Sequence, residues 1–206
     1  MKQGLFITFE GGEGAGKTTL IEEIYKHLLQ EGRQVLKTRE PGGTPLGEEI
    51  RALLLHHQGP VSPYAELSLF LASRAQHIAE VILPALQAGK IVLCDRFNDS
   101  TIAYQGMARG LGVEKVTAVC QFMCEGLEPH VTFYLDIDPE LGLSRTQKRS
   151  SVDRIEAEDI AFHTKIRDGY LAIHKKNPDR FRLLNAAQTP EAVFNQAIEF
   201  IKLLLY

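Results

Sequence analysis

The sequence predicts a three-layer α/β domain, in which helices cover both faces of a parallel sheet. Short apolar runs alternate along the chain with longer segments of helical spacing, and this alternation is typical of parallel strands. A glycine-rich turn follows the first apolar run directly. The 206 residues are 44% hydrophobic and 24% charged, a composition typical of a soluble globular protein. We therefore expect one domain over residues 1–206.

Five apolar runs are candidate strands, and they lie at residues 5–9, 34–38, 90–95, 131–136 and 180–185. Apolar residues recur with helical spacing at 17–30, 46–56, 65–88, 113–125, 139–148, 156–176 and 190–204. Pro139 and Pro190 follow the capping residues Asp138 and Thr189, so each proline is expected at a first helical position.

Ligands of parallel sheets bind at the carboxyl ends of the strands. The loops after Phe9, Thr38 and Asp95 are therefore the expected location of a functional site.

Composition excludes several classes of function. The net charge is −3, whereas a general nucleic-acid binder carries a basic excess, so no nucleic-acid partner is expected. No apolar run reaches the length of a membrane span, and the first run is too short for a signal peptide. Cys94, Cys120 and Cys124 form no CxxC pair, which is typical of reduced thiols. We expect a cytoplasmic protein with no membrane partner.

Residues 11–18 read GGEGAGKT and fit the phosphate-loop pattern G-x-x-x-x-G-K-[ST]. Glycines let the backbone N–H groups approach phosphate oxygens, and a following helix adds its positive N-terminus. A plain glycine-rich helix cap is the alternative, but the preceding strand and following helix favour phosphate. The expected nucleotide-binding residues are Gly11, Gly12, Glu13, Gly14, Ala15, Gly16, Lys17 and Thr18. Among them, Lys17 can reach the β and γ phosphates, and Thr18 can offer a hydroxyl to Mg²⁺.

Asp95 ends an apolar strand and is the natural candidate to hold Mg²⁺, directly or through water; a helix or turn cap is the alternative. Arg96 follows it, where many nucleotide hydrolases carry a glutamate that polarises water. An arginine there suits a second anionic substrate or transition-state charge. The sequence also lacks an N/T-K-x-D element for guanine. Both observations favour phosphoryl transfer to an organic acceptor over hydrolysis.

Further motifs follow the phosphate loop in a fixed order: TREPGG (38–43), DRF (95–97), STxAYQG (100–106) and DRIE (153–156). Together they resemble the bacterial thymidylate kinase family, which phosphorylates dTMP with ATP. The resemblance extends from about residue 4 to residue 205. It implies a P-loop nucleoside-monophosphate-kinase fold with a five-stranded parallel sheet and a short helical lid at about 141–155. It also implies ATP as phosphoryl donor, Mg²⁺, and a homodimer, with the 113–125 helix as a candidate interface.

The resemblance implies three residues at the acceptor phosphate. Glu13 corresponds to a loop acid near the sugar 3′-hydroxyl and phosphate. Arg51 corresponds to an arginine that grips the dTMP phosphate, and Arg96 to one that bridges donor and acceptor phosphates. Taken without the resemblance, Glu13 could cap the loop, and Arg51 could be a solvated charge on a helix.

The same resemblance implies a base pocket. Phe70 and Arg74 lie one helical turn apart, so they share a face. In the family the ring stacks on thymine and the arginine hydrogen-bonds its carbonyl edge, although a helical phenylalanine is more often core. Thr101 is expected to bond the pyrimidine, Tyr104 to crowd the 2′ position of a ribose, and Gln105 to close over the base.

Residues 145–154 carry four basic residues against one acid. Family members without an arginine in the phosphate loop place catalytic basic residues in the lid, and this chain has Ala15 at that position. The resemblance therefore implies transition-state charge from Lys148 and Arg149, with Arg145 flanking the adenine. A solvated helix face is the alternative.

These observations favour in-line transfer from ATP to dTMP. One rival is a kinase for another nucleotide, such as dUMP. Another is a regulatory nucleotide-binding protein with slow ATPase activity, which Arg96 and the AYQG segment disfavour. A nucleic-acid motor is disfavoured by net charge and chain length.

Overall fold

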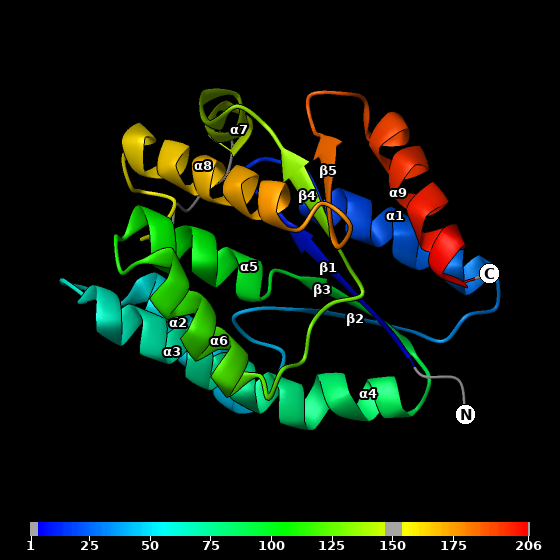
Figure 1. Ribbon diagram of the computed structural model, residues 1–206, viewed down its shortest axis with the longest axis horizontal. Helices are drawn as coiled ribbons and strands as arrows, with labels where there is room; N and C mark the ends of the chain where they lie inside the picture. The colour runs from blue at the N-terminus through cyan, green and yellow to red at the C-terminus, as the bar shows by residue number, and fades with distance from the viewer. Residues whose placement is uncertain (1–3, 147–153, 206) are drawn as a thin grey trace.

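The computed structural model describes residues 4–146 and 154–205, and all five expected strands are present. They are β1 (Leu5–Glu10), β2 (Val35–Arg39), β3 (Ile91–Asp95), β4 (Val131–Asp136) and β5 (Phe181–Asn185). They form one parallel sheet in the order β2-β3-β1-β4-β5 (Figure 1). Asp95 pairs with Phe9 on one side and with Arg39 on the other, so β1, β2 and β3 end together. The predicted α/β fold with a five-stranded parallel sheet is confirmed.

The helical segments between the strands follow the expected order. They are α1 (Lys17–Gln30), α2 (Pro45–His56), α3 (Pro63–His77), η1 (Ile78–Ile82), α4 (Leu83–Gln87), α5 (Asn98–Thr101), η2 (Ile102–Ala108), α6 (Val113–Met123), α7 (Pro139–Thr146), α8 (Ile160–Lys176) and α9 (Pro190–Leu205). Pro139 and Pro190 each begin a helix, as predicted, and Asp138 and Thr189 accept backbone N–H bonds from the first turns.

Three details differ from the sequence prediction. Residues 98–108 are helical, with a π-helical part (η2), although no helix was predicted there. Residues 101–106 are buried all round, so they lack the polar face that reveals an amphipathic helix. The helix expected over 65–88 is continuous but contains the π-helical turn η1 just before Pro84, which has no N–H to donate. Helix α8 begins at Ile160 because Asp159 caps it.

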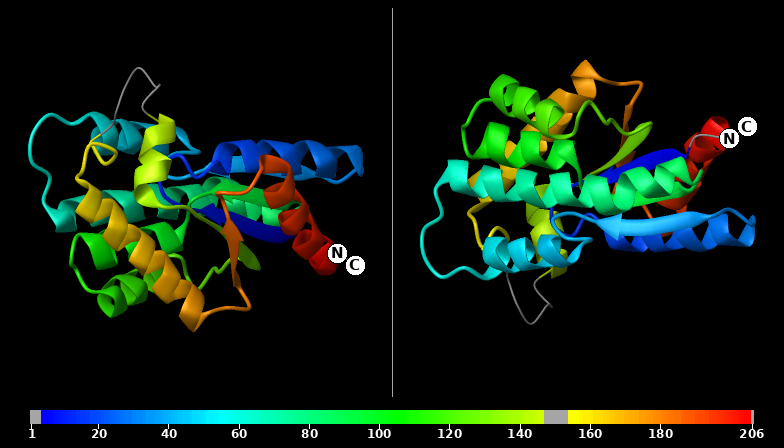
Figure 2. Two further views of the ribbon diagram at one scale, coloured as in Figure 1. Left: turned by 90° about the horizontal axis from the view of Figure 1, so that it is seen from above. Right: turned by 90° about the horizontal axis from the view of Figure 1, so that it is seen from below.

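Helices cover both faces of the sheet. Helices α1 and α9 lie side by side on one face and bury the strand residues Ile7, Phe9 and Phe133. The other face packs against η1 and α4 through Phe6, and against α6, η2 and α8 through Tyr134. Figure 2 shows α8 running alongside α5 and η2. Because successive strand residues point to opposite faces, both layers are anchored by the same short strands. Among the helices of residues 4–146 and 154–205, none is long and apolar enough to cross a membrane.

The phosphate loop packs directly against α7 through two glycines. Gly14 has φ +67°, and a Cβ placed on it would lie 2.0 Å from the carbonyl oxygen of Gly142. A Cβ on Gly142 would lie 2.3 Å from the carbonyl oxygen of Glu13. Only glycine at both positions allows this close approach. The loop is therefore held in place by the start of α7 as well as by α1.

Gly142→Ala tests this contact. The added methyl group must push α7 and the loop apart, so we expect the free energy of unfolding to fall by about 1–3 kcal/mol in urea denaturation. Ser144→Ala in the same helix removes an exposed hydroxyl and should change it by less than about 0.5 kcal/mol. Equal stability of Gly142→Ala and wild type would show that the contact is not tight.

Candidate active site

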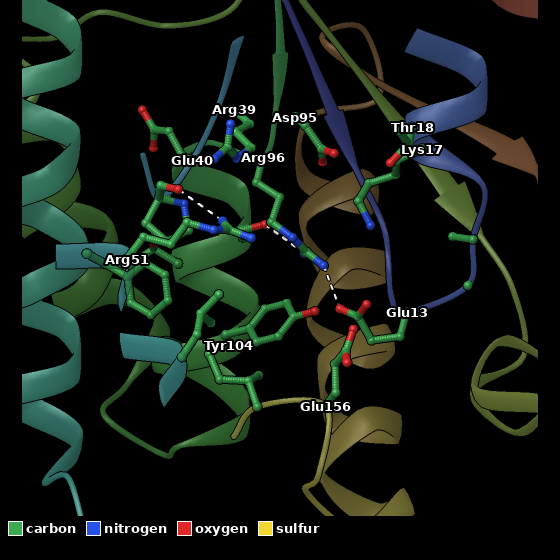
Figure 3. Close-up of a pocket in the computed structure, with 18 of the residues that line it drawn as sticks. Glu13, Lys17, Thr18, Arg39, Glu40, Arg51, Asp95, Arg96, Tyr104 and Glu156 are labelled. Carbon is green, nitrogen blue, oxygen red and sulfur yellow. Dashed lines mark hydrogen bonds and ion pairs between the residues drawn. The ribbon is translucent and has the colours of Figure 1, made fainter. Parts of the chain in front are cut away.

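A cavity of about 340 Å³ opens at the carboxyl ends of β1, β2 and β3 (Figure 3). The phosphate loop lines one end, and α2, α3 and η2 line the other. The residues expected from the sequence that line it are Glu13, Gly14, Ala15, Gly16, Lys17, Thr18, Arg51, Phe70, Arg74, Asp95, Arg96, Thr101, Tyr104 and Gln105. The structure thus brings most of the expected donor and acceptor residues to one cavity, although they come from distant parts of the sequence. Gly11, Gly12 and Arg145 are not among the residues that line it.

The phosphate loop turns the chain from β1 into α1. Gly16 precedes α1 with φ 91°, a left-handed conformation that glycine adopts readily. The Lys17 amine is half-buried and donates to the carbonyl oxygens of Gly11 and Gly12 at 3.0 and 3.2 Å. Burial, followed by the nearby Arg96, lowers the pKa of Lys17, while Asp95 and Glu13 act in the opposite direction. A polyanion bound next to the amine would therefore stabilise its charged form.

Arg96 occupies the centre of the cavity. Its φ is 70°, a left-handed conformation that a non-glycine residue rarely adopts. Its Nη2 donates to Oε1 of Glu13 at 2.8 Å, and its guanidinium lies 5.1 Å from the centre of the Tyr104 ring. Burial favours the neutral form of Glu13, but Arg96 and then Lys17 outweigh this and lower the Glu13 pKa. Glu13 is thus a carboxylate facing the same space as two cations (Figure 3).

Asp95 and Thr18 supply oxygen atoms suited to Mg²⁺. Oδ1 of Asp95 is buried and has no hydrogen-bond partner within the described part of the chain. A buried carboxylate oxygen normally has a partner, so this atom fits a ligand position. Thr18, the second residue of α1, offers a hydroxyl on the same side of the cavity (Figure 3). Mg²⁺ prefers one or two such oxygens together with substrate phosphates. The residues present therefore fit the expected ion.

Arg74 is almost fully buried, and its orientation is fixed by three hydrogen bonds. Nε donates to Oε2 of Glu40 at 2.6 Å, Nη1 to the Thr101 hydroxyl at 2.9 Å, and Nη2 to the carbonyl oxygen of Phe97 at 3.1 Å. Burial opposes its charge, yet Glu40 more than offsets this and raises the Arg74 pKa. A guanidinium has five N–H groups, so one remains on each Nη to donate to a ligand.

Glu40 is itself held by a buried chain of hydrogen bonds. Its Oε1 lies 2.9 Å from Nδ1 of His77, and Nε2 of His77 lies 2.7 Å from the Thr38 hydroxyl. A neutral His77 can donate to Glu40 and accept from Thr38. The chain connects the end of β2 to Arg74, so the loop after β2 and helix α3 position the same guanidinium.

The other acceptor-side residues differ in their contacts. Thr101 accepts from Arg74, which leaves its own proton free to donate. The buried Tyr104 hydroxyl has no hydrogen-bond partner among residues 4–146 and 154–205, and burial raises its pKa. Gln105 donates to the buried Glu66 at 2.9 Å. Arg51 donates to the carbonyl oxygen of Pro41 at 3.0 Å at the edge of the cavity.

The expected lid is described only in part. Nη1 of Arg145, in the last turn of α7, donates to the carbonyl oxygen of Ala186 at 3.1 Å and lies 3.4 Å from that of Gly14. This places Arg145 between the phosphate loop and the loop after β5. Lys148 and Arg149 lie outside the described residues, so their expected roles stay predictions.

Several residues that line the cavity were not assigned a role from the sequence, among them Arg39, Ser100 and Glu156. Arg39 ends β2 and pairs with Glu48, while Ser100 and Glu156 line the cavity beside Arg96 and Glu13. Arg39 and Glu156 lie inside the TREPGG and DRIE motifs, which provided a signal. Ser100 is the first residue of the STxAYQG motif, which also provided a signal, but it lies in a helix that was not predicted, so its contact with Arg96 could not be inferred.

His56 and His57 are exposed at the end of α2 and are not among the residues that line this cavity.

A phosphate loop and an arginine-lined acceptor pocket that share one cavity define a P-loop kinase of the nucleoside-monophosphate type. Comparison with known proteins identifies the family within this class. A family profile described as Thymidylate kinase matches residues 9–197. The chain belongs to the thymidylate kinase family.

Individual relatives cover nearly the full chain. A thymidylate kinase of Protochlamydia amoebophila is 51% identical, with 97% of this chain and 93% of that protein aligned. One from Chlamydia trachomatis serovar D is 48% identical, with 98% and 100% aligned. The crystal structure of thymidylate kinase from Ehrlichia chaffeensis superimposes with a TM-score of 0.79 at 35% identity, covering 97% of this chain and 99% of that one.

Glu40→Gln tests the support of Arg74. The substitution keeps the shape but leaves a buried guanidinium without its counter-charge, so we expect the free energy of unfolding to fall by about 3 kcal/mol in urea denaturation. Glu22→Gln breaks the exposed pair with Lys37 and should leave stability nearly unchanged. Equal effects of the two substitutions would contradict the assignment of Glu40 as the essential partner of Arg74.

Proposed function

We propose that this protein transfers the γ-phosphoryl group of ATP to dTMP, forming dTDP and ADP, as a step in dTTP synthesis. One observation carries the proposal: the phosphate loop and the pocket around Phe70 and Arg74 open into a single cavity, with Arg96 between them. An enzyme that only hydrolysed ATP would not need an organised acceptor pocket. Membership of the thymidylate kinase family supports the same reaction.

The reaction requires positioning and charge neutralisation more than proton transfer. The acceptor is a phosphate oxygen that is already ionised near neutral pH, so no strong general base is needed. Lys17 holds the β and γ phosphates of ATP, and Arg96 bridges the donor and acceptor phosphates. Arg51 binds the acceptor phosphate from α2. The pairing of Glu13 with Arg96 holds the guanidinium in place before substrate binds.

Mg²⁺ would be held by the Thr18 hydroxyl and the unpartnered oxygen of Asp95. When bound, it neutralises charge on the β and γ phosphates. The phosphate-loop residues Gly11, Gly12, Gly14, Ala15 and Gly16 surround the phosphates with backbone N–H groups.

The acceptor base is selected by the pocket of α3 and η2. Phe70 stacks on the thymine ring, and the two remaining Nη protons of Arg74 face a carbonyl oxygen of the base. Because Arg74 only donates, it rejects a base with an amino group in that place. Thr101 donates to the pyrimidine, Tyr104 occupies the space of a ribose 2′-hydroxyl, and Gln105 closes over the base.

The remaining features are proposed from the resemblance. Arg145 flanks the adenine, and Lys148 and Arg149 supply transition-state charge from a lid over residues 141–155. The enzyme is a homodimer in which α6, with exposed Val119 and Phe122, faces a second copy. It works in the cytoplasm, where its three free, buried cysteines stay reduced.

Product analysis tests the reaction. The protein with ATP, Mg²⁺ and dTMP should form dTDP and ADP in a one-to-one ratio, measured by ion-exchange chromatography. Lys17→Ala should lower kcat at least about 100-fold, because it removes a cation from the transferred phosphate. Lys37→Ala, on the outer surface of β2, should stay within twofold of wild type. ADP without dTDP, or full turnover by Lys17→Ala, would contradict the proposal.

A further inference from the structure

The backbone around Arg96 is held by two consecutive residues of β1. The Arg96 N–H donates to the carbonyl oxygen of Phe9 at 2.9 Å, and the next N–H, of Phe97, donates to Oε1 of Glu10 at 2.8 Å. A left-handed arginine persists only where its neighbours determine its conformation. The main chain of Phe9 and the side chain of Glu10 thus hold this turn from both sides.

Glu10 also contacts both hydroxyl groups that touch the Arg96 guanidinium. Nη1 of Arg96 lies 3.3 Å from the Ser100 hydroxyl and 3.4 Å from the Tyr170 hydroxyl. Each hydroxyl also forms a hydrogen bond with Oε2 of Glu10, and that of Tyr170 is 2.9 Å long. The two hydroxyl oxygens lie 2.9 Å from each other. Glu10 is fully buried at the end of β1. Its carboxylate is therefore the centre of a small buried cluster with Arg96 on its outer side.

Proton counting shows what this cluster does. Each hydroxyl has one proton, and an ionised carboxylate accepts only. Tyr170 donates either to Glu10 directly or to Ser100, and Ser100 donates to Glu10. In both arrangements the two protons stay inside the cluster, so both oxygens face Arg96 as acceptors. Arg96 has no acceptor of its own, so this arrangement suits its Nη1 protons.

We infer that Glu10 is a positioning residue for Arg96: it fixes the turn that carries Arg96 and orients the Ser100 and Tyr170 hydroxyls to accept from its guanidinium. The inference rests on the proposed function, in which Arg96 binds the acceptor phosphate. Glu10 itself lies behind Arg96 and is not among the residues that line the cavity. Its effect on catalysis is therefore indirect, through the guanidinium.

Glu10→Gln tests the inference in the full chain. The amide keeps the shape but replaces one accepting oxygen by an NH₂ group. This donor group then faces either the Phe97 N–H or the two hydroxyls, which are donors themselves. We expect the dissociation constant for dTMP to rise at least fivefold, measured by isothermal titration calorimetry. The constant for thymidine, which has no phosphate, should stay within twofold. The titrations are made at pH 8, because burial and then Asp99 raise the Glu10 pKa to about 7.

Two further variants separate positioning from a general structural role. In an Arg96→Ala background, Glu10→Gln should change dTMP affinity by less than twofold, because the group that it positions is gone. Asp136→Asn alters another carboxylate at the end of a strand, which pairs with Arg167, and should leave dTMP affinity within twofold. If Glu10→Gln does not fold, Tyr170→Phe replaces it, with an expected loss of at least twofold for dTMP and none for thymidine.

Three results would overturn the inference. Unchanged dTMP affinity in Glu10→Gln would show that Arg96 needs no such support. Equal losses for dTMP and thymidine would show collapse of the whole pocket. If the fold-change in the dTMP dissociation constant of the double variant equals the product of the two single-variant fold-changes, Glu10 and Arg96 act independently. If the wild type binds neither ligand, the proposed function fails, and the inference fails with it; wild-type binding with an unaffected variant rejects the inference alone.

Discussion

The turn after β3 is the constraint on which the rest of the site depends. Three neighbouring strands end at the same level, with Asp95 paired to Phe9 and to Arg39. The left-handed conformation of Arg96 then turns the chain sharply away from the sheet. Consecutive side chains consequently reach different parts of one cavity: Asp95 lies near Lys17, and Arg96 extends to Glu13 and over the Tyr104 ring (Figure 3). A turn without the left-handed conformation of Arg96 would not place both side chains in the same cavity.

Several cationic side chains line the cavity. The most buried of them form ion pairs with carboxylates of the surrounding structure. Arg74 meets Glu40, and Arg96 meets Glu13. A buried charge without a partner would cost several kcal/mol, so these pairings are conditions for folding. They also fix orientation, because each guanidinium has donors directed at the protein and donors left for a ligand. Charges that are oriented before substrate binds need little reorganisation during phosphoryl transfer. Stability and catalysis therefore depend on the same contacts.

Much of this site could be predicted from local sequence signals. The phosphate loop is contiguous, and its flanking strand and helix have clear periodicity, so the position of Lys17 followed directly. Phe70 and Arg74 lie one turn apart on a single helix, which predicted a shared face. Helix 98–108 was missed because residues 101–106 are buried on all sides and lack the periodicity that reveals a surface helix.

The supporting contacts could not be predicted, because they join residues far apart in the sequence. Glu10 and Tyr170 are 160 positions apart, and Thr38 and His77 are 39 apart. In the sequence Glu10 reads as the polar end of an apolar strand, and His77 as one more residue of a helix. Only the packing of β1, β2, α3 and α8 around one cavity gives these residues their partners.

The central claim is that donor and acceptor sites act as one catalytic unit. It is tested most directly by ADP release from ATP and Mg²⁺ with dTMP, dUMP, dCMP, UMP, AMP or no acceptor. The account predicts rapid release with dTMP, weaker release with dUMP, and little with the other acceptors or with none. A missing methyl group changes binding by only about 1–3 kcal/mol, so dUMP should retain some activity. Equal ADP release with and without every acceptor would contradict the account, since the phosphate loop would then serve hydrolysis alone.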